Sequence, residues 1–241
     1  MSFVLELHTK LPKKELLERL KQHEPWGHRI DFTNGVTTAD LARRTPFSEN
    51  TLQKLFTVAE RIPFANLRGG TLLDVGCNSG YNSIHAASRY GMNVTGIDVT
   101  QRHLDVSSFL AEIASVQCEF LIDSAETFSR PGEYNVVLHF GTLYHLPNPL
   151  LSLQTTLANL KPGGWLALET QTYDNPDNPE LCHYIHGYNN DKTNFWAISE
   201  HVLTKYLEFI GFIKVETLMR VAVPVFGEHM NRVVMVAKKR G

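Results

Sequence analysis

The sequence has few cysteines, and this scarcity excludes two classes of small domain. Its 241 residues include three cysteines, Cys77, Cys118 and Cys182, and none of them forms a C-x-x-C pair. That number and spacing argue against a disulfide framework and against a structural zinc site. We therefore expect free thiols, no bound metal and a reducing compartment, the cytoplasm.

Long apolar runs and basic stretches are also missing. No segment has the length of a membrane span, and the N-terminal segment carries too many charges for a signal peptide. The formal net charge is −2, and the only basic cluster is the short "KKR" close to the C-terminus. Nucleic-acid-binding domains usually carry a basic patch. The composition therefore gives no support to a membrane or a nucleic acid as partner and favours a small-molecule substrate.

What the sequence does contain, from Thr71 onward, is an alternation of short β-type runs with helix-length segments. This alternation predicts an α/β fold with a mostly parallel sheet and helices on both faces. The last two strand-like runs, "FIKVETLM" and "RVVMVAKK", are joined without a helix. The C-terminal strand is therefore expected to run antiparallel.

The segment before Thr71 has a different pattern. Helices are expected over 12–23 and over 48–62, where Ser48 is a candidate N-cap, and a loop or short strand pair is expected over 24–38. The predicted organisation is an N-terminal helical cap over 1–66 and a ligand-binding domain over 67–241, with a lid insertion over 173–197.

The stretch "LLDVGCNSGYNS", residues 72–83, predicts a strand that turns sharply into a helix around a ligand. Gly76 and Gly80 enclose a wider turn than the G-x-G-x-x-G fingerprint of dinucleotide-binding proteins. Asp74, at the entrance to the turn, would repel a pyrophosphate. A ligand with a cationic amino-acid end and an adenosine end suits this turn better.

The next two strands also end in acidic residues. Asp98 ends the second strand, where folds of this kind bind ribose hydroxyls. Asp123 ends the third strand and can accept from an exocyclic amine, while the amide of Ser124 or Ala125 meets a ring nitrogen. The alternatives are a surface acid at Asp98 and a turn cap at Asp123.

These motifs resemble those of the class I S-adenosylmethionine-dependent methyltransferases. The resembling segments, in order from Thr71 to Lys239, are "LLDVGCNSG", "VTGID", "LIDSAE", "VVLHFGTLYHL" and "LKPGGWLALET". The resemblance implies a Rossmann-like fold with a seven-stranded sheet, and S-adenosyl-L-methionine as methyl donor. The residues expected at the cofactor are Asp74, Gly76, Cys77, Asn78, Gly80, Asp98, Val99, Asp123, Ser124, Ala125, Phe140 and Gly141.

The segment "HFGTLYHLPNP" follows the strand beside the cofactor and holds the candidate catalytic residues, Tyr144 and His145. An acceptor with a hydroxyl or ring N–H needs a base, and histidine titrates near neutral pH. The alternative for His145 is a structural cap before Pro147. His139, within the strand, is expected to be a packed residue.

The 173–197 insertion is rich in Pro, Asn, Tyr and His, as lids and binding loops often are. Its His183 and His186 have the H-x-x-H spacing of a metal site, but no third ligand is indicated. The N-terminal "PWGHRID" is expected to return over the same cleft, with simple packing as the alternative. The candidate substrate-binding residues are Trp26, His28, Arg29, Tyr173, Tyr184, Tyr188, Trp196 and Arg232.

Within the methyltransferases the chain is most similar to the bacterial branch that includes the tRNA wobble-uridine carboxymethyltransferases. The shared features include "GHRID", "GTLYHLPNPLLSL" and "NRVVMVAKK". In that branch a carboxylated donor is held by Tyr and basic residues, and Tyr144 and Arg232 stand at matching positions. The chain lacks the branch's longer N-terminal region, and we expect it to lack the lysine that this region contributes.

The preferred prediction is therefore methyl transfer to a small-molecule acceptor, on oxygen or nitrogen, with a possible His base. A tRNA methyl- or carboxymethyltransferase is the main alternative. A nicotinamide-dependent oxidoreductase is disfavoured by the missing G-x-G-x-x-G, and a non-catalytic cofactor-binding domain is the remaining alternative.

Overall fold

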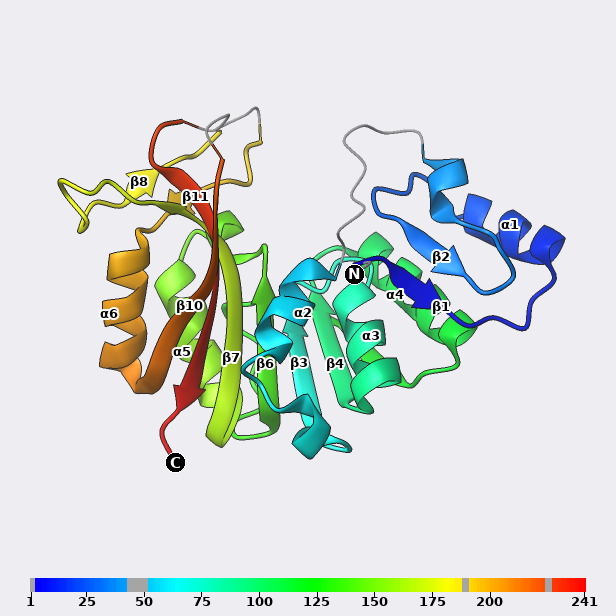
Figure 1. Cartoon of the computed structure of the whole chain (residues 1–241), viewed down its shortest axis with the longest axis horizontal. Coiled ribbons are helices and arrows are strands. Elements are labelled where there is room, and N and C mark those ends of the chain that lie inside the picture. Colours follow the sequence, from blue (N-terminus) through cyan, green and yellow to red (C-terminus); the bar gives the residue numbers. More distant parts are fainter. Residues whose placement is uncertain (1–2, 43–51, 188–190, 224–226) are drawn as a thin grey trace.

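A seven-stranded mixed sheet forms the centre of the molecule (Figure 1). The computed structural model describes residues 3–42, 52–187, 191–223 and 227–241. The strands lie in the order β10-β11-β7-β6-β3-β4-β5. The strands that pair in parallel are β3 (Thr71–Val75), β4 (Asn93–Asp98), β5 (Cys118–Ile122), β6 (Tyr134–Phe140) and β7 (Leu160–Tyr173).

The C-terminal strand runs against its neighbours, as predicted. β11 (Met230–Lys239) is antiparallel both to β7 and to β10 (Phe212–Ala222). This confirms the predicted fold class. β10 and β11 extend beyond the runs "FIKVETLM" and "RVVMVAKK", and β7 begins at Leu160, at the start of the segment "LKPGGWLALET".

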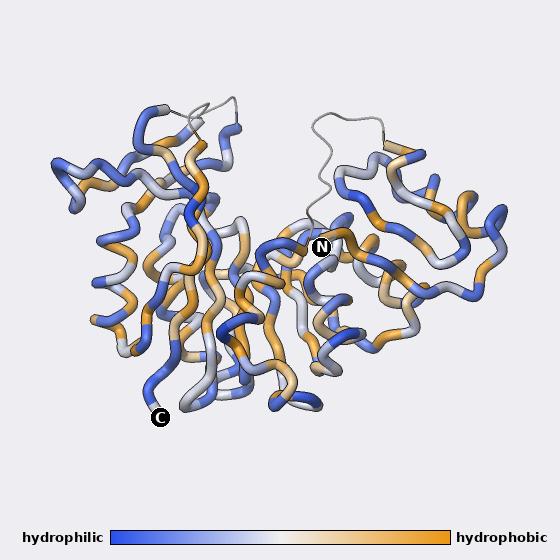
Figure 2. The backbone as a smooth tube through the Cα atoms, in the orientation of Figure 1, coloured by the Kyte–Doolittle hydropathy of each residue, from blue (hydrophilic) through white to orange (hydrophobic). Residues whose placement is uncertain are grey.

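Helices cover both faces of the sheet because successive strand residues point to opposite sides. Leu72 on β3 packs into one core cluster, and the adjacent Leu73 packs into the other. Hydrophobic colour accordingly recurs along the central strands in Figure 2. The first cluster includes side chains of α2 (Gln53–Ala59), α3 (Tyr81–Tyr90) and α4 (Gln101–Ala114); the second includes those of α5 (Pro149–Asn159) and α6 (Glu200–Ile210).

The N-terminal segment forms a small unit beside α4 (Figure 1). It contains β1 (Leu5–Leu7), α1 (Lys13–Lys21), β2 (Ile30–Phe32) and the 3-10 helix η1 (Thr38–Leu41). β2 pairs in parallel with β1, whereas the expected pair within 24–38 is reduced to one bridge, Asp31 to Thr37. Arg19 forms an ion pair with Glu112 on α4 at 2.9 Å, and His23 stacks on Phe109.

The remaining elements are short. They are the 3-10 helices η2 (Phe64–Leu67) and η3 (Leu143–His145) and the antiparallel strands β8 (His183–Tyr184) and β9 (Trp196–Ala197). The helix expected over 48–62 is present as the shorter α2, and the candidate cap Ser48 lies outside the described residues. In the described part of the chain, none of the helices has the length and apolar composition of a transmembrane span.

Candidate active site

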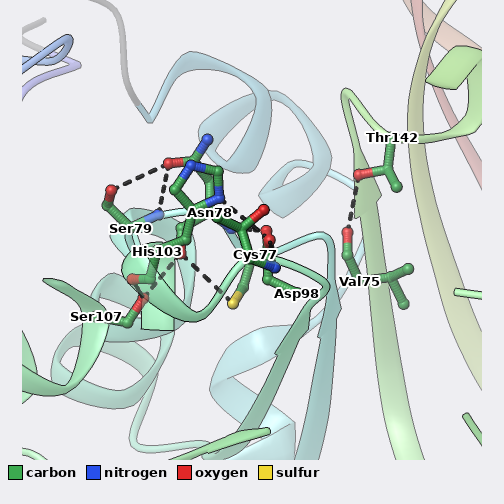
Figure 3. Close-up of polar contacts among 9 residues, drawn as sticks. Val75, Cys77, Asn78, Ser79, Asp98, His103, Ser107 and Thr142 are labelled. Atoms are coloured by element: carbon green, nitrogen blue, oxygen red, sulfur yellow. Dashed lines mark hydrogen bonds and ion pairs between the residues drawn. The ribbon is translucent and has the colours of Figure 1, made fainter. Parts of the chain in front are cut away.

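The turn after β3 is shaped by the close approach of Thr142. Gly76 has φ +67°, and a Cβ atom at this position would lie 2.2 Å from Thr142 Oγ1. The Thr142 hydroxyl donates to the carbonyl of Val75 at 3.1 Å, which joins the end of β3 to the loop after β6 (Figure 3). Only glycine satisfies both the backbone conformation and the space at residue 76.

Asp98, at the end of β4, organises one side of the site (Figure 3). Its Oδ2 accepts from the Asn78 amide at 3.0 Å. Its Oδ1 accepts from the Thr100 amide at 2.9 Å and lies 3.1 Å from His103 Nδ1. A carboxylate offers about four acceptor positions, so one remains for a ligand hydroxyl.

Three of the residues predicted to bind cofactor lie behind the turn instead. Asp74 is 2% exposed and accepts from Ser83 Oγ at 2.6 Å, and burial raises the pKa of its carboxyl to about 6. Cys77 is buried, and burial raises the pKa of its thiol, which excludes a reactive thiolate at neutral pH. Gly80 packs against Ser107. These residues shape the turn and do not line the cavity beside it.

The cavity beside the turn has a volume of about 420 Å³, within the range of small-molecule and cofactor sites, about 300–1,000 Å³. It lies at the carboxyl ends of the parallel strands, where ligands bind in open α/β sheets. Eight residues predicted at the cofactor line it: Gly76, Asn78, Asp98, Val99, Asp123, Ser124, Ala125 and Gly141. Phe140, which precedes Gly141 in the sequence, is 8% exposed and does not line the cavity.

The loop after β5 contributes Asp123, Ser124 and Ala125 to the lining of this cavity. Asp123 Oδ1 accepts from the Ser124 amide at 2.7 Å and from Thr127 Oγ1 at 3.2 Å. Asp123 therefore caps its own turn as well as lining the cavity. Because the Ser124 amide is already used, the Ala125 amide is the better of the two predicted donors to a ring nitrogen.

His145 also lines the cavity. Its Nδ1 lies 3.2 Å from the carbonyl oxygen of Thr193 and 2.9 Å from Thr193 Oγ1. A carbonyl only accepts, so this contact places the hydrogen on Nδ1 and leaves Nε2 with its lone pair. Burial lowers the pKa of His145, which keeps the ring neutral at pH 7. A neutral ring with this tautomer can accept a proton at Nε2.

A charged cluster adjoins the cavity and consists of Lys54, Tyr144, Glu169 and Arg232; we call it the Glu169 cluster. Glu169 Oε2 lies 2.5 Å from Lys54 Nζ, and its Oε1 lies 2.7 Å from Arg232 Nη1. Arg232 Nη2 donates to the Tyr144 hydroxyl at 2.7 Å. Burial alone would raise the pKa of Glu169, but Lys54 and Arg232 hold it below its ordinary value.

Gly141 connects the Glu169 cluster to the cavity. A Cβ atom on Gly141 would lie 3.6 Å from both Glu169 Oε2 and Lys54 Nζ and 4.0 Å from the Tyr144 hydroxyl. Two cations and one carboxylate leave a net positive charge at this wall. The expectation that no lysine from the N-terminal region reaches the site is therefore wrong, because α2 supplies Lys54.

The three N-terminal candidates for substrate contact have different surroundings. Trp26 does not cover the cleft. It is 2% exposed, and its indole donates to the carbonyl of Leu20 in the core. Arg29 Nε is bound to Asp31 at 2.9 Å. His28 packs against Tyr81 with ring centroids 4.7 Å apart, and burial, with a contribution from nearby Lys54, lowers its pKa to about 4.

The 173–197 insertion contacts the turn that carries the candidate catalytic residues. The Phe195 amide donates to the carbonyl of Tyr144 at 2.8 Å, and the Trp196 indole donates to Pro147 at 3.2 Å. Trp196 lines a separate apolar cavity of about 360 Å³ with Leu150. These contacts hold the end of the insertion against η3 and the residues that follow it.

Of the insertion's tyrosines, the two that the structure describes, Tyr173 and Tyr184, do not line the cofactor cavity. Tyr173 packs edge-on against His183, with ring centroids 4.9 Å apart, and Tyr184 is 56% exposed. Tyr188 lies outside the described residues. Among the residues that the structure describes, no group of three or more His, Cys, Asp or Glu side chains could hold a metal ion.

His139 is packed within β6, as expected. It is fully buried, its Nε2 lies 2.8 Å from Ser152 Oγ, and burial lowers its pKa to about 4.

Sequence reasoning missed several residues of the site. Asp98 lies just before α4, so residues in the first turn of that helix are close to its carboxylate. Thr100 and His103 could have been predicted on this ground. Glu169 and Lys54 carried no local signal. The cavity residues that were missed are Ile97, Thr100, His103, Thr142, Leu146 and Thr193.

Comparison with known proteins identifies the family of the chain. The family described as "Methyltransferase domain" matches residues 47–217. A ubiquinone biosynthesis O-methyltransferase of Xanthomonas campestris pv. campestris is 35% identical over 119 residues, which cover 48% of this chain and 48% of that protein. A tRNA U34 carboxymethyltransferase of Desulfotalea psychrophila is 28% identical over 206 residues, covering 84% of this chain and 61% of that protein. The chain thus spans about half to three fifths of these relatives.

Solved structures share the fold. The N-terminal domain of EvdMO1 with SAH bound has a TM-score of 0.74 at 19% identity, covering 95% of this chain and 98% of that chain. The 1,6-didemethyltoxoflavin-N1-methyltransferase of Burkholderia thailandensis has a TM-score of 0.57 at 20% identity, covering 78% and 82%. At these identities the likeness concerns the fold alone.

Proposed function

The chain belongs to the methyltransferase domain family, and we propose that it is an S-adenosylmethionine-dependent methyltransferase that methylates an oxygen or nitrogen atom of a small-molecule acceptor. The observation that carries this proposal is the single cavity that joins Asp98 and Gly76 to His145. One end offers a carboxylate for hydroxyl groups, and the other offers a neutral imidazole for proton removal.

The residues at the cavity fit the cofactor. When bound, S-adenosylmethionine supplies a methyl group on a positively charged sulfur, so the protein mainly positions the reactants and excludes water. Asp98 would accept from a ribose hydroxyl with its remaining acceptor position. The Ala125 amide would meet the adenine ring, and the turn at Gly76 would admit the amino-acid end.

The acceptor side of the site requires groups that bind and deprotonate. His145 Nε2 is the proposed base for an acceptor hydroxyl or ring N–H. The net positive charge of the Glu169 cluster stabilises the anion that forms when the acceptor loses this proton. The cavity volume and the overall negative charge of the chain support a small acceptor over a polynucleotide.

A second candidate function is carboxymethyl transfer to a tRNA wobble uridine. Lys54, Tyr144 and Arg232 gather beside Gly141, where they could hold the extra carboxylate of a carboxylated donor. The 28% identity with a tRNA U34 carboxymethyltransferase over 84% of the chain supports this candidate. The absence of a basic stretch in the sequence argues against it.

We also propose the division of the chain into an N-terminal cap, residues 1–66, and a catalytic domain, residues 67–241. A cytoplasmic location fits the free thiols of Cys77, Cys118 and Cys182.

A donor-exchange experiment tests the proposal and separates it from the second candidate. Calorimetry should detect binding of S-adenosylhomocysteine, and a methyl-transfer screen with S-adenosylmethionine should release S-adenosylhomocysteine with at least one small acceptor. Preference for a carboxylated donor, together with tRNA binding that weakens steeply with salt, would favour the second candidate. Binding of S-adenosylhomocysteine without turnover on any acceptor or tRNA would contradict both.

A further inference from the structure

The side-chain nitrogen of Gln171 is buried and has no hydrogen-bond partner among the described residues. The whole residue is 4% exposed. Buried polar groups are nearly always paired, so such a donor requires an explanation. Asn159 shows the usual arrangement: its Oδ1 accepts from the Arg130 amide at 2.7 Å, and its Nδ2 donates to Phe128 at 3.0 Å.

Gln171 stands next to the Glu169 cluster. Residues two apart on a strand point to the same face, so Gln171 shares the face of β7 from which Glu169 reaches Lys54 and Arg232. In the antiparallel register with β11, Gln171 lies directly opposite Arg232. Side chains at opposite positions are close neighbours on one face, about 5 Å apart at Cβ.

The charges of this group define what it can bind. Lys54 and Arg232 carry two positive charges, and Glu169 carries one negative charge, so the cluster attracts an anionic oxygen. The Gln171 carboxamide is neutral and pairs with an uncharged oxygen. A ligand that satisfies both would carry an oxyanion and a second oxygen a few bonds away.

We propose that Gln171 is a specificity-determining residue for the acceptor, with its N–H donating to an uncharged oxygen of a small organic acid whose anionic oxygen is held by Lys54 and Arg232. This inference rests on the proposed function, because it assigns the Glu169 cluster to the acceptor. The matching substrates are hydroxy acids and enolic or phenolic acids with two oxygens on neighbouring carbons.

The stability of a ligand-free variant is the first test. Met has nearly the length of Gln and no hydrogen-bonding demand, so Gln171→Met should raise the urea midpoint of unfolding, because an unpaired buried donor is removed. The matched control, Asn159→Leu, should lower the midpoint, because it deletes a fully paired carboxamide. A midpoint that falls in Gln171→Met as it does in the control would mean that Gln171 serves the fold, which overturns the proposal.

The second test measures binding of two probes to protein saturated with S-adenosylhomocysteine. Salicylate carries a carboxylate and a hydroxyl on neighbouring carbons, whereas benzoate carries the carboxylate alone. The wild type should bind salicylate about 3- to 10-fold more tightly than benzoate, the size of one hydrogen bond, and Gln171→Met should lose this preference with benzoate affinity unchanged. An equal preference in both proteins, or a wild type that binds neither probe, would overturn the proposal.

The two proposals fail in different ways. Loss of the salicylate preference in the variant concerns Gln171 only if S-adenosylhomocysteine affinity is the same in both proteins. A wild type that binds no S-adenosylhomocysteine refutes the proposed function itself, before either probe is added.

Discussion

Arg232 donates a hydrogen bond of 2.7 Å to the hydroxyl of Tyr144, and its guanidinium carbon lies 4.9 Å from the centroid of the same ring. The two residues come from β11 and from η3, which are distant in the sequence. Arg232 also binds Glu169 through its other terminal nitrogen. The rigid fork of one guanidinium thus fixes a tyrosine and a carboxylate next to Gly141, which lines the cofactor cavity.

Arg232→Lys tests this arrangement, because lysine keeps the charge and loses the fork. We expect kcat/KM for the acceptor to fall about tenfold or more, as for a hydrogen bond to a charged group. The affinity for S-adenosylhomocysteine should stay unchanged in calorimetry. Tyr144→Phe, which removes one hydroxyl and keeps the ring, is the control and should cost less. A fall confined to the affinity for a carboxylated donor would favour the second candidate function.

Asp98→Ala should weaken S-adenosylhomocysteine binding by about 1.5–3 kcal/mol, because hydrogen bonds between a carboxylate and ribose hydroxyls are lost. Titration calorimetry measures this as about a 10- to 100-fold rise in Kd. Asp105→Ala, on the exposed face of α4, is the matched control and should leave Kd unchanged. The same Kd in Asp98→Ala and wild type would refute the ribose assignment.

His145→Ala should lower turnover by about 10²- to 10⁴-fold, the usual contribution of general acid–base catalysis, with little change in cofactor affinity. In the wild type the rate should fall as the pH drops through the pKa of His145, which burial sets below 6.5, because the base must be neutral. The variant should lose this acid limb. Thr193→Val, which removes a hydrogen-bond partner of Nδ1, should cause a smaller fall. Wild-type turnover in His145→Ala would assign the residue a structural role.

Asp74 should make the protein less stable as the pH rises. Burial raises its folded pKa from 3.8 to about 6, so between these values the native carboxyl holds a proton that the unfolded one has released. Stability from this group is complete below pH 3.8 and declines until the pH exceeds 6, by at most about 3 kcal/mol. Asp74→Asn should therefore gain stability over the wild type on going from pH 4 to pH 7 in urea unfolding. A difference that is constant over this range would contradict the assignment.

Gly76→Ala and Gly132→Ala separate backbone strain from steric overlap. Both glycines have φ +67°, but only at Gly76 would the new Cβ meet a neighbour, Thr142. Gly132→Ala should cost about 1–2 kcal/mol of unfolding free energy, and Gly76→Ala about 2–5 kcal/mol with loss of cofactor binding. Equal costs in the two variants would show that the contact with Thr142 is easily relieved.

The fold and the cofactor end of the site were predictable because their signals are local. The apolar run of β3, the glycines after it and the acid at the end of β4 each follow from a few consecutive residues. Parallel strands then bring Gly76 and Asp98 together at one edge of the sheet. The position of Asp74 was misjudged because its side chain points beneath the turn toward Ser83, which a linear spacing does not reveal.

The acceptor end depends on contacts between distant segments. Lys54 meets Glu169 only after α2 packs across the sheet, and Arg232 reaches the same carboxylate from the C-terminal strand. The position of Trp26 could not be predicted for the same reason. An aromatic ring in a loop can cover a cleft or fill a core, and in this structure the indole donates to Leu20 and lies in the core. The register of β7 against β11 places Gln171 opposite Arg232, and no local pattern encodes that register.

The hydroxyl of Thr142 occupies the space in which a side chain at position 76 would lie. The residues at positions 76 and 142 therefore have to change together. A chimera that imports the first motif from a relative must import the residue after the fourth strand of the parallel set as well. Substitution of Thr142 by a larger side chain is therefore expected to be tolerated poorly, although the residue lines the cavity.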